Sequence, residues 1–419
     1  MRREGETIMT AAPGASFRAR LKPMDPAGPR FAGDVVDLLL DEARGARATD
    51  IHLNPTPDGQ EVAWRIDGVL HQVARLPASS APNVVSRLKV MADLLTYRNN
   101  VPQEGRVKAE PGALETRVST FPTLHGERAV IRMFAPANRY ARLDELGLTE
   151  AIAQSLRTLL DETSGLIVFA GPAGSGKTTT LYTCLRELVA TSRGTRCLTT
   201  LEDPIEVAVP GVCQSQVNAA AGFTLESGLR SLMRQDPEVI AVGEVRDRDV
   251  ARVAFQAALS GHLVLTTFHA GSAAGALGRL ADLDIEPYML LSGLRAVVFQ
   301  RLARRLCSCS ITIQDSTAFL GLEVKRAFAP VGCPECDGTG YRGRLVLAEA
   351  LFPERGALAR AVLGRADVPT LEAAARADGF VDRWRQAAEA VEAGWTSPLE
   401  ARRVLGFGSS QEHHALDSL

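Results

Sequence analysis

Long apolar runs are missing from this sequence. No segment approaches the roughly 20 consecutive apolar residues that a membrane-spanning helix needs. The N-terminus also lacks the apolar core of a signal peptide. The sequence therefore predicts neither membrane spanning nor export, and we expect a cytoplasmic protein.

Neither sign of charge is in excess, and cysteine is scarce. The chain has 47 lysines and arginines against 49 aspartates and glutamates, with a pI of about 6.4. This balance excludes the global positive field of non-specific nucleic-acid binders, so we expect no nucleic-acid partner. Seven cysteines in 419 residues are too few for a disulfide framework. Three of them are scattered, and four lie between Cys307 and Cys336.

What is present is the composition of a soluble, folded protein. Hydrophobic residues make up 46% and charged residues 23% of the chain, which is typical of globular domains. The two ends depart from this composition. Residues 1–30 hold four prolines and several glycines, and the last residues are polar, so we expect flexible tails over 1–30 and 406–419.

Hydrophobic patterning divides the rest of the chain. An amphipathic helix followed by alternating strands such as EVAWRI and ERAVIRMF predicts a small α+β domain over 31–140. Over 141–300, the short apolar strands GLIVFA, CLTTLE, EVIAVGE and HLVLTTFH alternate with helical stretches. This alternation predicts an α/β domain with a parallel sheet that binds ligands at the carboxyl ends of its strands. A cysteine-bearing module over 301–350 and a helical region over 351–405 complete the predicted order.

A phosphate-binding loop lies between one of these strands and a helix. The stretch GPAGSGKT fits the pattern G-x-x-x-x-G-K-[ST] between GLIVFA and TTLYTCLRELVA. Its glycines let backbone N–H groups and the helix N-terminus surround phosphates. Lys177 is predicted to reach the β- and γ-phosphates of ATP, and Thr178 to bind Mg²⁺. The predicted nucleotide-binding residues are Gly171, Pro172, Ala173, Gly174, Ser175, Gly176, Lys177, Thr178 and Thr179.

Acidic residues end two other strands of the predicted sheet. ATP hydrolysis needs carboxylates that orient the attacking water and help to hold the metal. Glu202 ends CLTTLE and Glu244 ends EVIAVGE, so a parallel sheet presents both at one edge. His269 ends TTFH at the same edge. Its position alone leaves open whether it senses a γ-phosphate or is an ordinary packed histidine.

Taken together, these segments resemble a known family. GPAGSGKTTTLY, LEDPIEV, LRSLMRQDPEVIAVGEVRD and GHLVLTTFHA follow one another in the sequence. In this order they resemble the Walker A, Asp box, Walker B and His box of the secretion ATPase superfamily, which drives type II secretion and type IV pilus assembly. Further segments from DIHLNP to EAGWTSPLEARRVL extend the resemblance over roughly residues 31–405.

The resemblance implies a RecA-like P-loop ATPase domain preceded by a PAS-like domain. It implies a hexameric ring with nucleotide between the two domains of each subunit. It also implies that Glu244 is the catalytic base, Glu202 a second glutamate near the metal and water, and His269 a γ-phosphate contact. Arg117 and Arg132 fall where the family places arginines that reach the phosphates from the first domain. A guanidinium there neutralises charge on the transferred phosphoryl group.

The four clustered cysteines predict a metal site with an irregular first half. Cys333 and Cys336 form C-x-x-C, a spacing that lets two thiolates converge on one tetrahedral ion. Cys307 and Cys309 supply the other pair, but their spacing is C-x-C, and Ser310 stands where similar modules have the second cysteine. Either Cys309 reaches a Zn²⁺ ion through a distorted loop, or the site is incomplete.

With this resemblance, the sequence is interpreted as a cytoplasmic ring ATPase of the family, which pushes on an inner-membrane platform protein to assemble a pilus or pseudopilus. Such a protein reaches the inner face of the membrane through its partners. Two alternatives stay open: a retraction or DNA-transport ATPase of the same superfamily, and a scaffold that binds nucleotide but hydrolyses little. The combination of Lys177, Glu202 and Glu244 argues against the scaffold.

Overall fold

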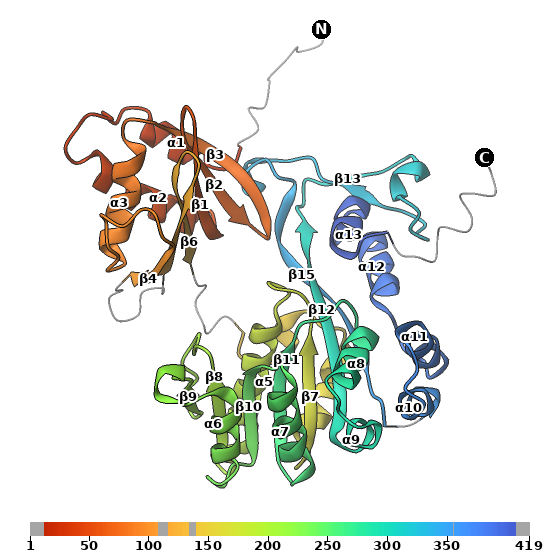
Figure 1. The fold of residues 1–419 in the computed structure, drawn as a ribbon. Coiled ribbons are helices and arrows are strands. Elements are labelled where there is room, and N and C mark those ends of the chain that lie inside the picture. The colour runs from red at the N-terminus through yellow and green to blue at the C-terminus, as the bar shows by residue number, and fades with distance from the viewer. Residues whose placement is uncertain (1–11, 108–115, 134–139, 355, 408–419) are drawn as a thin grey trace. The chain divides into compact units, whose positions relative to one another are not determined.

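The computed structural model describes residues 12–107, 116–133, 140–354 and 356–407, whose helices and strands are drawn in Figure 1. The chain divides into two compact units, each of which is described by itself. Within the described part of the chain, no helix is long and apolar enough to cross a membrane. Unit 1 holds residues 1–139, 304–312 and 329–344, and unit 2 holds residues 140–303, 313–328 and 345–419.

Unit 1 is built on a six-stranded antiparallel sheet with the order β3-β2-β1-β6-β5-β4. Because side chains alternate between the two faces of a strand, Ile51 and Leu53 enter the core with Trp64 and the helices. Asp50 therefore lies on the opposite face. The strands are β1 (Ala48–Thr56), β2 (Gly59–Ile66), β3 (Val69–Pro77), β4 (Gln103–Val107), β5 (Thr116–Thr123) and β6 (Gly126–Met133), and the helices are α1 (Ala15–Leu21), α2 (Phe31–Gly45) and α3 (Ala81–Met91).

Residues 12–30 are folded, so the prediction of a flexible tail over 1–30 is wrong for this part. Helix α1 places Phe17 in the core of unit 1, where it is fully buried and its ring centroid lies 5.7 Å from that of Trp64. Composition missed this because a single buried aromatic ring can dock a short segment that is otherwise rich in proline and glycine. The rest of that tail, and residues 408–419, lie outside the described residues.

Unit 2 is built on a seven-stranded sheet with the order β15-β12-β7-β11-β10-β8-β9. All pairs from β12 to β9 are parallel. Both faces of β7 are buried, with Val168 in one core and Phe169 in the other. The strands are β7 (Gly165–Ala170), β8 (Leu198–Glu202), β9 (Cys213–Gln216), β10 (Val239–Glu244), β11 (Leu263–Phe268), β12 (Leu294–Leu306) and β15 (Tyr341–Leu351). Residues 304–306 of β12 and 341–344 of β15 are assigned to unit 1. The helices are α4 (Glu150–Leu160), α5 (Lys177–Ser192), α6 (Leu225–Leu232), α7 (Arg248–Leu259), α8 (Ala273–Asp282) and α9 (Pro287–Gly293).

The last described residues of unit 2 are mainly helical, and the cysteine-bearing stretch precedes them in the chain. Between β12 and β15 lie the short strands β13 (Ile311–Thr312) and β14 (Phe328–Ala329). All four clustered cysteines belong to segments that group with unit 1, which the order of the sequence does not predict. The Gly343 N–H donates to Asp67 at 2.9 Å and ties this stretch to the turn between β2 and β3. The C-terminal helices are α10 (Gly356–Leu363), α11 (Val368–Ala377), α12 (Arg383–Glu392) and α13 (Pro398–Leu405).

Candidate nucleotide site and cysteine cluster

The loop between β7 and α5 is shaped by its glycines. Gly174 and Gly176 have φ angles of 73° and 93°, in the left-handed region that favours glycine. A Cβ atom on Gly171 would lie 2.6 Å from the Gln300 carbonyl oxygen, so this position also needs glycine. Lys177 begins α5, and its Nζ donates to two loop carbonyls at 3.0 and 2.9 Å. The lysine therefore lies inside the curve of the loop.

Gln300 on β12 holds this loop from the side, and sequence reasoning missed it. Its Nε2 donates to the Ser175 carbonyl at 3.0 Å, and its Oε1 accepts the Thr180 hydroxyl at 3.0 Å. The side chain is almost fully buried, and a buried amide is stable only where its hydrogen bonds are made. The signal that could have found it is a glutamine at the end of the apolar run AVVFQ.

A cavity of about 130 Å³ lies beside the loop, at the carboxyl ends of β8 and β10. Three of the predicted site residues line it: Thr178, Glu202 and Glu244. A parallel sheet brings such residues together because it sets the carboxyl ends of its strands along one edge. The remaining lining residues are Asp203, Pro204, Glu206, Leu225, Gly243, Arg246 and Thr267.

Glu244 is contacted by a histidine and an arginine. His269 Nε2 lies 3.0 Å from Glu244 Oε1, and Arg246 Nη2 lies 2.8 Å from Oε2. The Glu244 side chain is still 20% exposed, so water can reach the carboxylate. Arg246 was not predicted, although it follows closely in VGEVRD. Burial lowers the pKa of Lys177, and the Glu244 and Glu206 carboxylates oppose that shift.

Glu202 is more enclosed than Glu244 and is held by three donors. The Tyr182 hydroxyl donates to Oε2, while Thr200 Oγ1 and Gln214 Nε2 donate to Oε1 at 2.6 and 3.0 Å. The Tyr182 oxygen also accepts the Glu206 N–H at 3.2 Å. Burial and the bond to Glu202 raise the pKa of Tyr182, which keeps its hydroxyl protonated as a donor. The three donors were not predicted, and the role of Glu202 near metal and water stays a prediction.

Tyr182→Phe is expected to lower the free energy of unfolding by about 1 to 3 kcal/mol. The reason is that the buried Glu202 carboxylate loses a donor and the Glu206 N–H loses an acceptor. Urea denaturation followed by tryptophan fluorescence measures the change. Tyr97→Phe is the matched control, because Tyr97 is 77% exposed, and it should stay within about 0.5 kcal/mol of wild type. Equal stabilities of the two variants would contradict a structural role for Tyr182.

The two predicted arginines lie in unit 1. Arg117 on β5 and Arg132 on β6 are opposite each other in the antiparallel ladder, so they share one face of the sheet. Arg132 Nε donates to Asp50 Oδ1 at 3.0 Å, yet its side chain is 65% exposed. Arg106 on β4 lies opposite Arg117, so a row of guanidinium groups crosses this face. Their contact with phosphates stays a prediction.

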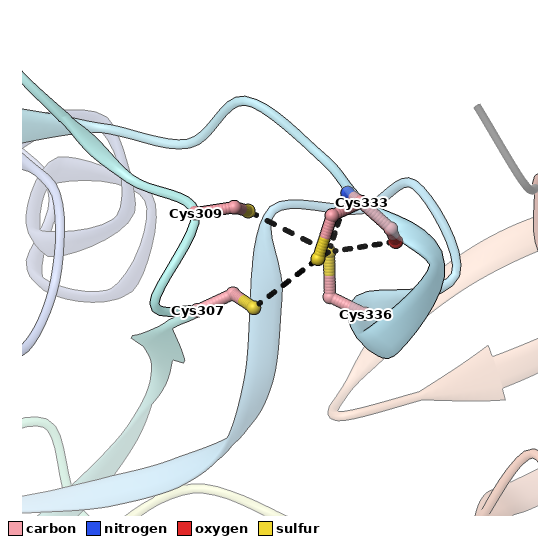
Figure 2. A group of neighbouring side chains, drawn as sticks. All are labelled: Cys307, Cys309, Cys333 and Cys336. Atoms are coloured by element: carbon pink, nitrogen blue, oxygen red, sulfur yellow. Dashed lines mark hydrogen bonds between the residues drawn. The ribbon is translucent and has the colours of Figure 1, made fainter. Parts of the chain in front are cut away.

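The four clustered cysteines converge on one point (Figure 2). The Sγ atoms of Cys307 and Cys333 are 3.8 Å apart, those of Cys309 and Cys336 are 3.9 Å apart, and all four lie within 4.8 Å of one another. A tetrahedral Zn²⁺ ion with bonds of about 2.3 Å sets its sulfur ligands about 3.8 Å apart. The spacing therefore fits a closed zinc site. Cys309 reaches the cluster through a turn in which the Ser310 N–H donates to the Cys307 carbonyl at 3.0 Å.

Backbone N–H groups contact the sulfur atoms of the cluster. The N–H groups of Cys333 and Gly340 donate to Cys336 Sγ at 3.1 and 3.2 Å. The hydrogen bond from the Cys309 backbone lowers the pKa of Cys307 to about 7, whereas burial raises the pKa of Cys309 and of Cys333. Zinc ligands must be deprotonated, so binding of the ion has to displace protons from these thiols. Four thiolates leave no open coordination position, so the chemistry of the donor set is that of a structural ion.

Comparison with known proteins gives the family. Residues 28–405 match the family described as Type II/IV secretion system protein. The chain belongs to that family. This Type II/IV secretion system protein is 40% identical over 325 residues to type II secretion system protein E of Klebsiella pneumoniae, covering 76% of this chain and 65% of that protein. It is 38% identical over 383 residues to the type IV pilus assembly ATPase TfpB of Acinetobacter baylyi, covering 88% of this chain and 65% of TfpB.

Solved structures show which known folds this chain resembles. The ATPase DotB of Legionella pneumophila superposes with a TM-score of 0.65 at 20% identity, covering 91% of this chain and 97% of DotB. The pilus retraction motor PilT with bound ADP superposes with a TM-score of 0.60 at 22% identity, covering 88% of this chain and 96% of PilT. Both likenesses confirm the predicted fold class, an α/β P-loop core with a preceding α+β domain. This Type II/IV secretion system protein spans just under two thirds, 65%, of the two curated relatives named above.

Proposed function

We propose that this Type II/IV secretion system protein hydrolyses ATP to assemble a type II pseudopilus or type IV pilus. In this proposal it is a hexameric ring that acts on an inner-membrane platform protein. The observation that carries the proposal is the cavity that joins Thr178, Glu202 and Glu244 beside the lysine of the loop. A nucleotide-binding scaffold has no need of this set of residues. The kind of machine is proposed from the names of its relatives, type II secretion system protein E and a type IV pilus assembly ATPase.

The proposed reaction gives each residue a role that is consistent with its contacts. Lys177 Nζ exchanges its two loop carbonyls for β- and γ-phosphate oxygens. Mg²⁺ held by Thr178, when bound, supplies positive charge that neutralises the phosphates. Glu244 takes the proton of the attacking water, and His269, which lies 3.0 Å from it, contacts the γ-phosphate. Glu202, which its three donors hold in place, acts as a second glutamate near the metal and the attacking water.

Unit 1 is proposed to supply the remaining positive charge. Arg117 and Arg132 reach the phosphates in this scheme, where guanidinium groups stabilise the charge that spreads over the transferred phosphoryl oxygens. A nucleotide that binds one arrangement of two domains better than another shifts the equilibrium between them. Hydrolysis then removes the preference for that arrangement, and the resulting domain motion is the mechanical step of the ring.

Assembly is preferred over pilus retraction or DNA transport because of the names of the curated relatives. The relatives named for type II secretion and for pilus assembly are 40% and 38% identical to this chain. All of these activities use the same catalytic groups, so the site itself does not separate them. No nucleic-acid partner is proposed, because the charges of the chain are balanced.

Mg-ATP hydrolysis measured against protein concentration tests the proposal. Turnover per subunit should rise with concentration if the active form is an oligomer. Lys177→Ala should lower the affinity for ATP by about tenfold or more, because charged hydrogen bonds to the phosphates are lost. Lys325→Ala, which changes an exposed lysine of the same unit, is the control and should leave affinity and turnover unchanged. A wild type that binds ATP but turns it over no faster than Lys177→Ala at any concentration would favour the scaffold.

A further inference from the structure

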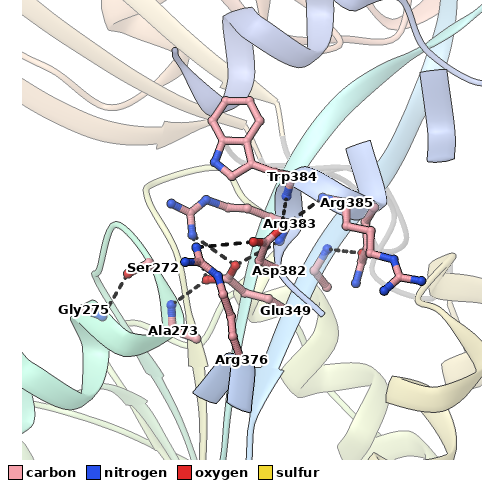
Figure 3. A network of polar contacts seen from close by, with 11 residues as sticks. Ser272, Ala273, Gly275, Glu349, Arg376, Asp382, Arg383, Trp384 and Arg385 are labelled. Atoms are coloured by element: carbon pink, nitrogen blue, oxygen red, sulfur yellow. Dashed lines mark hydrogen bonds and ion pairs between the residues drawn. The ribbon is translucent and has the colours of Figure 1, made fainter. Parts of the chain in front are cut away.

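Glu349 on β15 is a buried carboxylate where two helices of unit 2 begin. It is 1% exposed, and an unpaired charge at that depth is strongly disfavoured. Its Oε1 accepts the Ala273 N–H at 2.8 Å, and its Oε2 accepts the Arg383 N–H at 3.1 Å. The Arg383 guanidinium lies 3.0 and 3.1 Å from the two oxygens. Figure 3 shows these bonds converging on the one carboxylate.

Glu349 joins the N-termini of α8 and α12. Ala273 is the first residue of α8, and Arg383 is the first residue of α12. Each helix already has its own N-cap, Ser272 for α8 and Asp382 for α12. Negative charge at a helix N-terminus is favourable because the free N–H groups carry partial positive charge. One carboxylate therefore stabilises both helix starts and fixes the distance between them.

Helix α8 is bonded directly to the backbone that carries His269. Ala273, held by Glu349, comes four residues after His269 in the chain. Further along α8, the Arg279 guanidinium donates to the His269 carbonyl. A shift of α8 therefore moves the histidine. His269 Nε2 in turn lies 3.0 Å from Glu244 Oε1, so the contact between these two side chains depends on where α8 begins.

We propose that Glu349 and Arg383 are positioning residues that fix His269 against Glu244 by holding the N-terminus of α8. The inference rests on the proposed function, in which His269 contacts the γ-phosphate. It goes further by giving the C-terminal helices a part in nucleotide recognition, since α12 reaches α8 through the buried Glu349 ion pair. Neither positioning residue is among those that line the cavity beside Glu244.

The test compares the binding of ATPγS and ADP, because only ATPγS carries a γ-phosphoryl group and neither ligand needs to be hydrolysed. Wild type is expected to prefer ATPγS. Glu349→Gln should lower the ATPγS affinity about five- to tenfold and leave ADP affinity within about twofold, a range usual for coupling between separate sites. In a His269→Ala background, Glu349→Gln should lower ATPγS affinity by less than about twofold, because the group it positions is gone. Titration calorimetry measures the ATPγS and ADP affinities of wild type and Glu349→Gln, and the ATPγS affinities of His269→Ala and of the double variant.

Glu400→Gln is the matched control for a general loss of stability. Glu400 is a fully buried carboxylate on α13 that accepts the Arg403 Nε at 2.7 Å. The Glu400→Gln variant should lower the thermal midpoint of unfolding as Glu349→Gln does, but it should keep the preference for ATPγS over ADP.

Arg383→Met tests the same ion pair from its other side if Glu349→Gln folds poorly, and it should also lose the preference for ATPγS. Arg383→Lys, which keeps a charged donor, should retain more of that preference than Arg383→Met.

Three results would overturn the positioning role. The first is that Glu349→Gln lowers the preference for ATPγS over ADP equally in wild type and in the His269→Ala background. The second is that Glu400→Gln lowers this preference as much as Glu349→Gln does. The third is a wild type that does not distinguish ATPγS from ADP. The proposed function fails separately: a wild type that shows the predicted coupling but hydrolyses no ATP would contradict it and leave the positioning role supported.

Discussion

Glu244→Gln is expected to slow Mg-ATP hydrolysis by about 100- to 10,000-fold, the range for loss of a general base. Glutamine keeps the shape of the side chain and a hydrogen-bonding oxygen, but it cannot take the proton of the attacking water. The bonds between Lys177 and its loop do not involve Glu244. ATP should therefore still bind. Single-turnover hydrolysis of labelled ATP, run beside filter binding, measures the two properties separately.

Glu238→Gln is the matched control for this prediction. Glu238 precedes β10, the strand that Glu244 ends, and it accepts the Cys197 N–H at 3.1 Å from an exposed position. The substitution is chemically the same but lies at the amino end of the strand, so the hydrolysis rate should stay within about twofold of wild type. A Glu244→Gln protein that hydrolyses ATP at the wild-type rate would remove Glu244 from the mechanism.

The edge of the sheet that carries the site could be predicted because its signals are local. The phosphate-binding loop has a fixed spacing of glycine and lysine between a strand and a helix. Glu202 and Glu244 each end a short apolar strand, and every parallel sheet sets such ends along one edge whatever the strand order. The structure accordingly places both glutamates around one cavity with Thr178.

The residues that support this edge could not be predicted, because their partners are distant in the sequence. Tyr182 bonds to Glu202 across 20 positions, and Thr180 bonds to Gln300 across 120. In the sequence, a tyrosine in a helix and a glutamine at a strand end are both consistent with packing. Their roles appear only once the strand order sets β12 beside β7. The bridge from Glu349 to Ala273 escaped prediction for the same reason.

Loss of a cysteine of the cluster is expected to be strongly damaging to unit 1. If the four thiolates bind Zn²⁺, Cys336→Ser should lose that ion and lower the free energy of unfolding by about 3 kcal/mol or more, because the binding free energy of a structural metal contributes directly to folding. Serine is a poor zinc ligand, and Cys336 Sγ also accepts two backbone N–H groups. Cys213→Ser is the control, since Cys213 is exposed and outside the cluster. Metal mass spectrometry and urea unfolding measure both effects.

Cys309→Ser addresses the irregular C-x-C pair directly. Its Sγ lies 3.9 Å from that of Cys336, so a four-thiolate site requires this variant to lose zinc and stability as Cys336→Ser does. Adding Ser310→Cys to Cys309→Ser creates the regular C-x-x-C spacing, which allows two thiolates to converge on one ion, and zinc should return. A Cys309→Ser protein that keeps its zinc and the stability of wild type would show that three thiolates suffice. The fourth cysteine would then lie beside the ion without binding it.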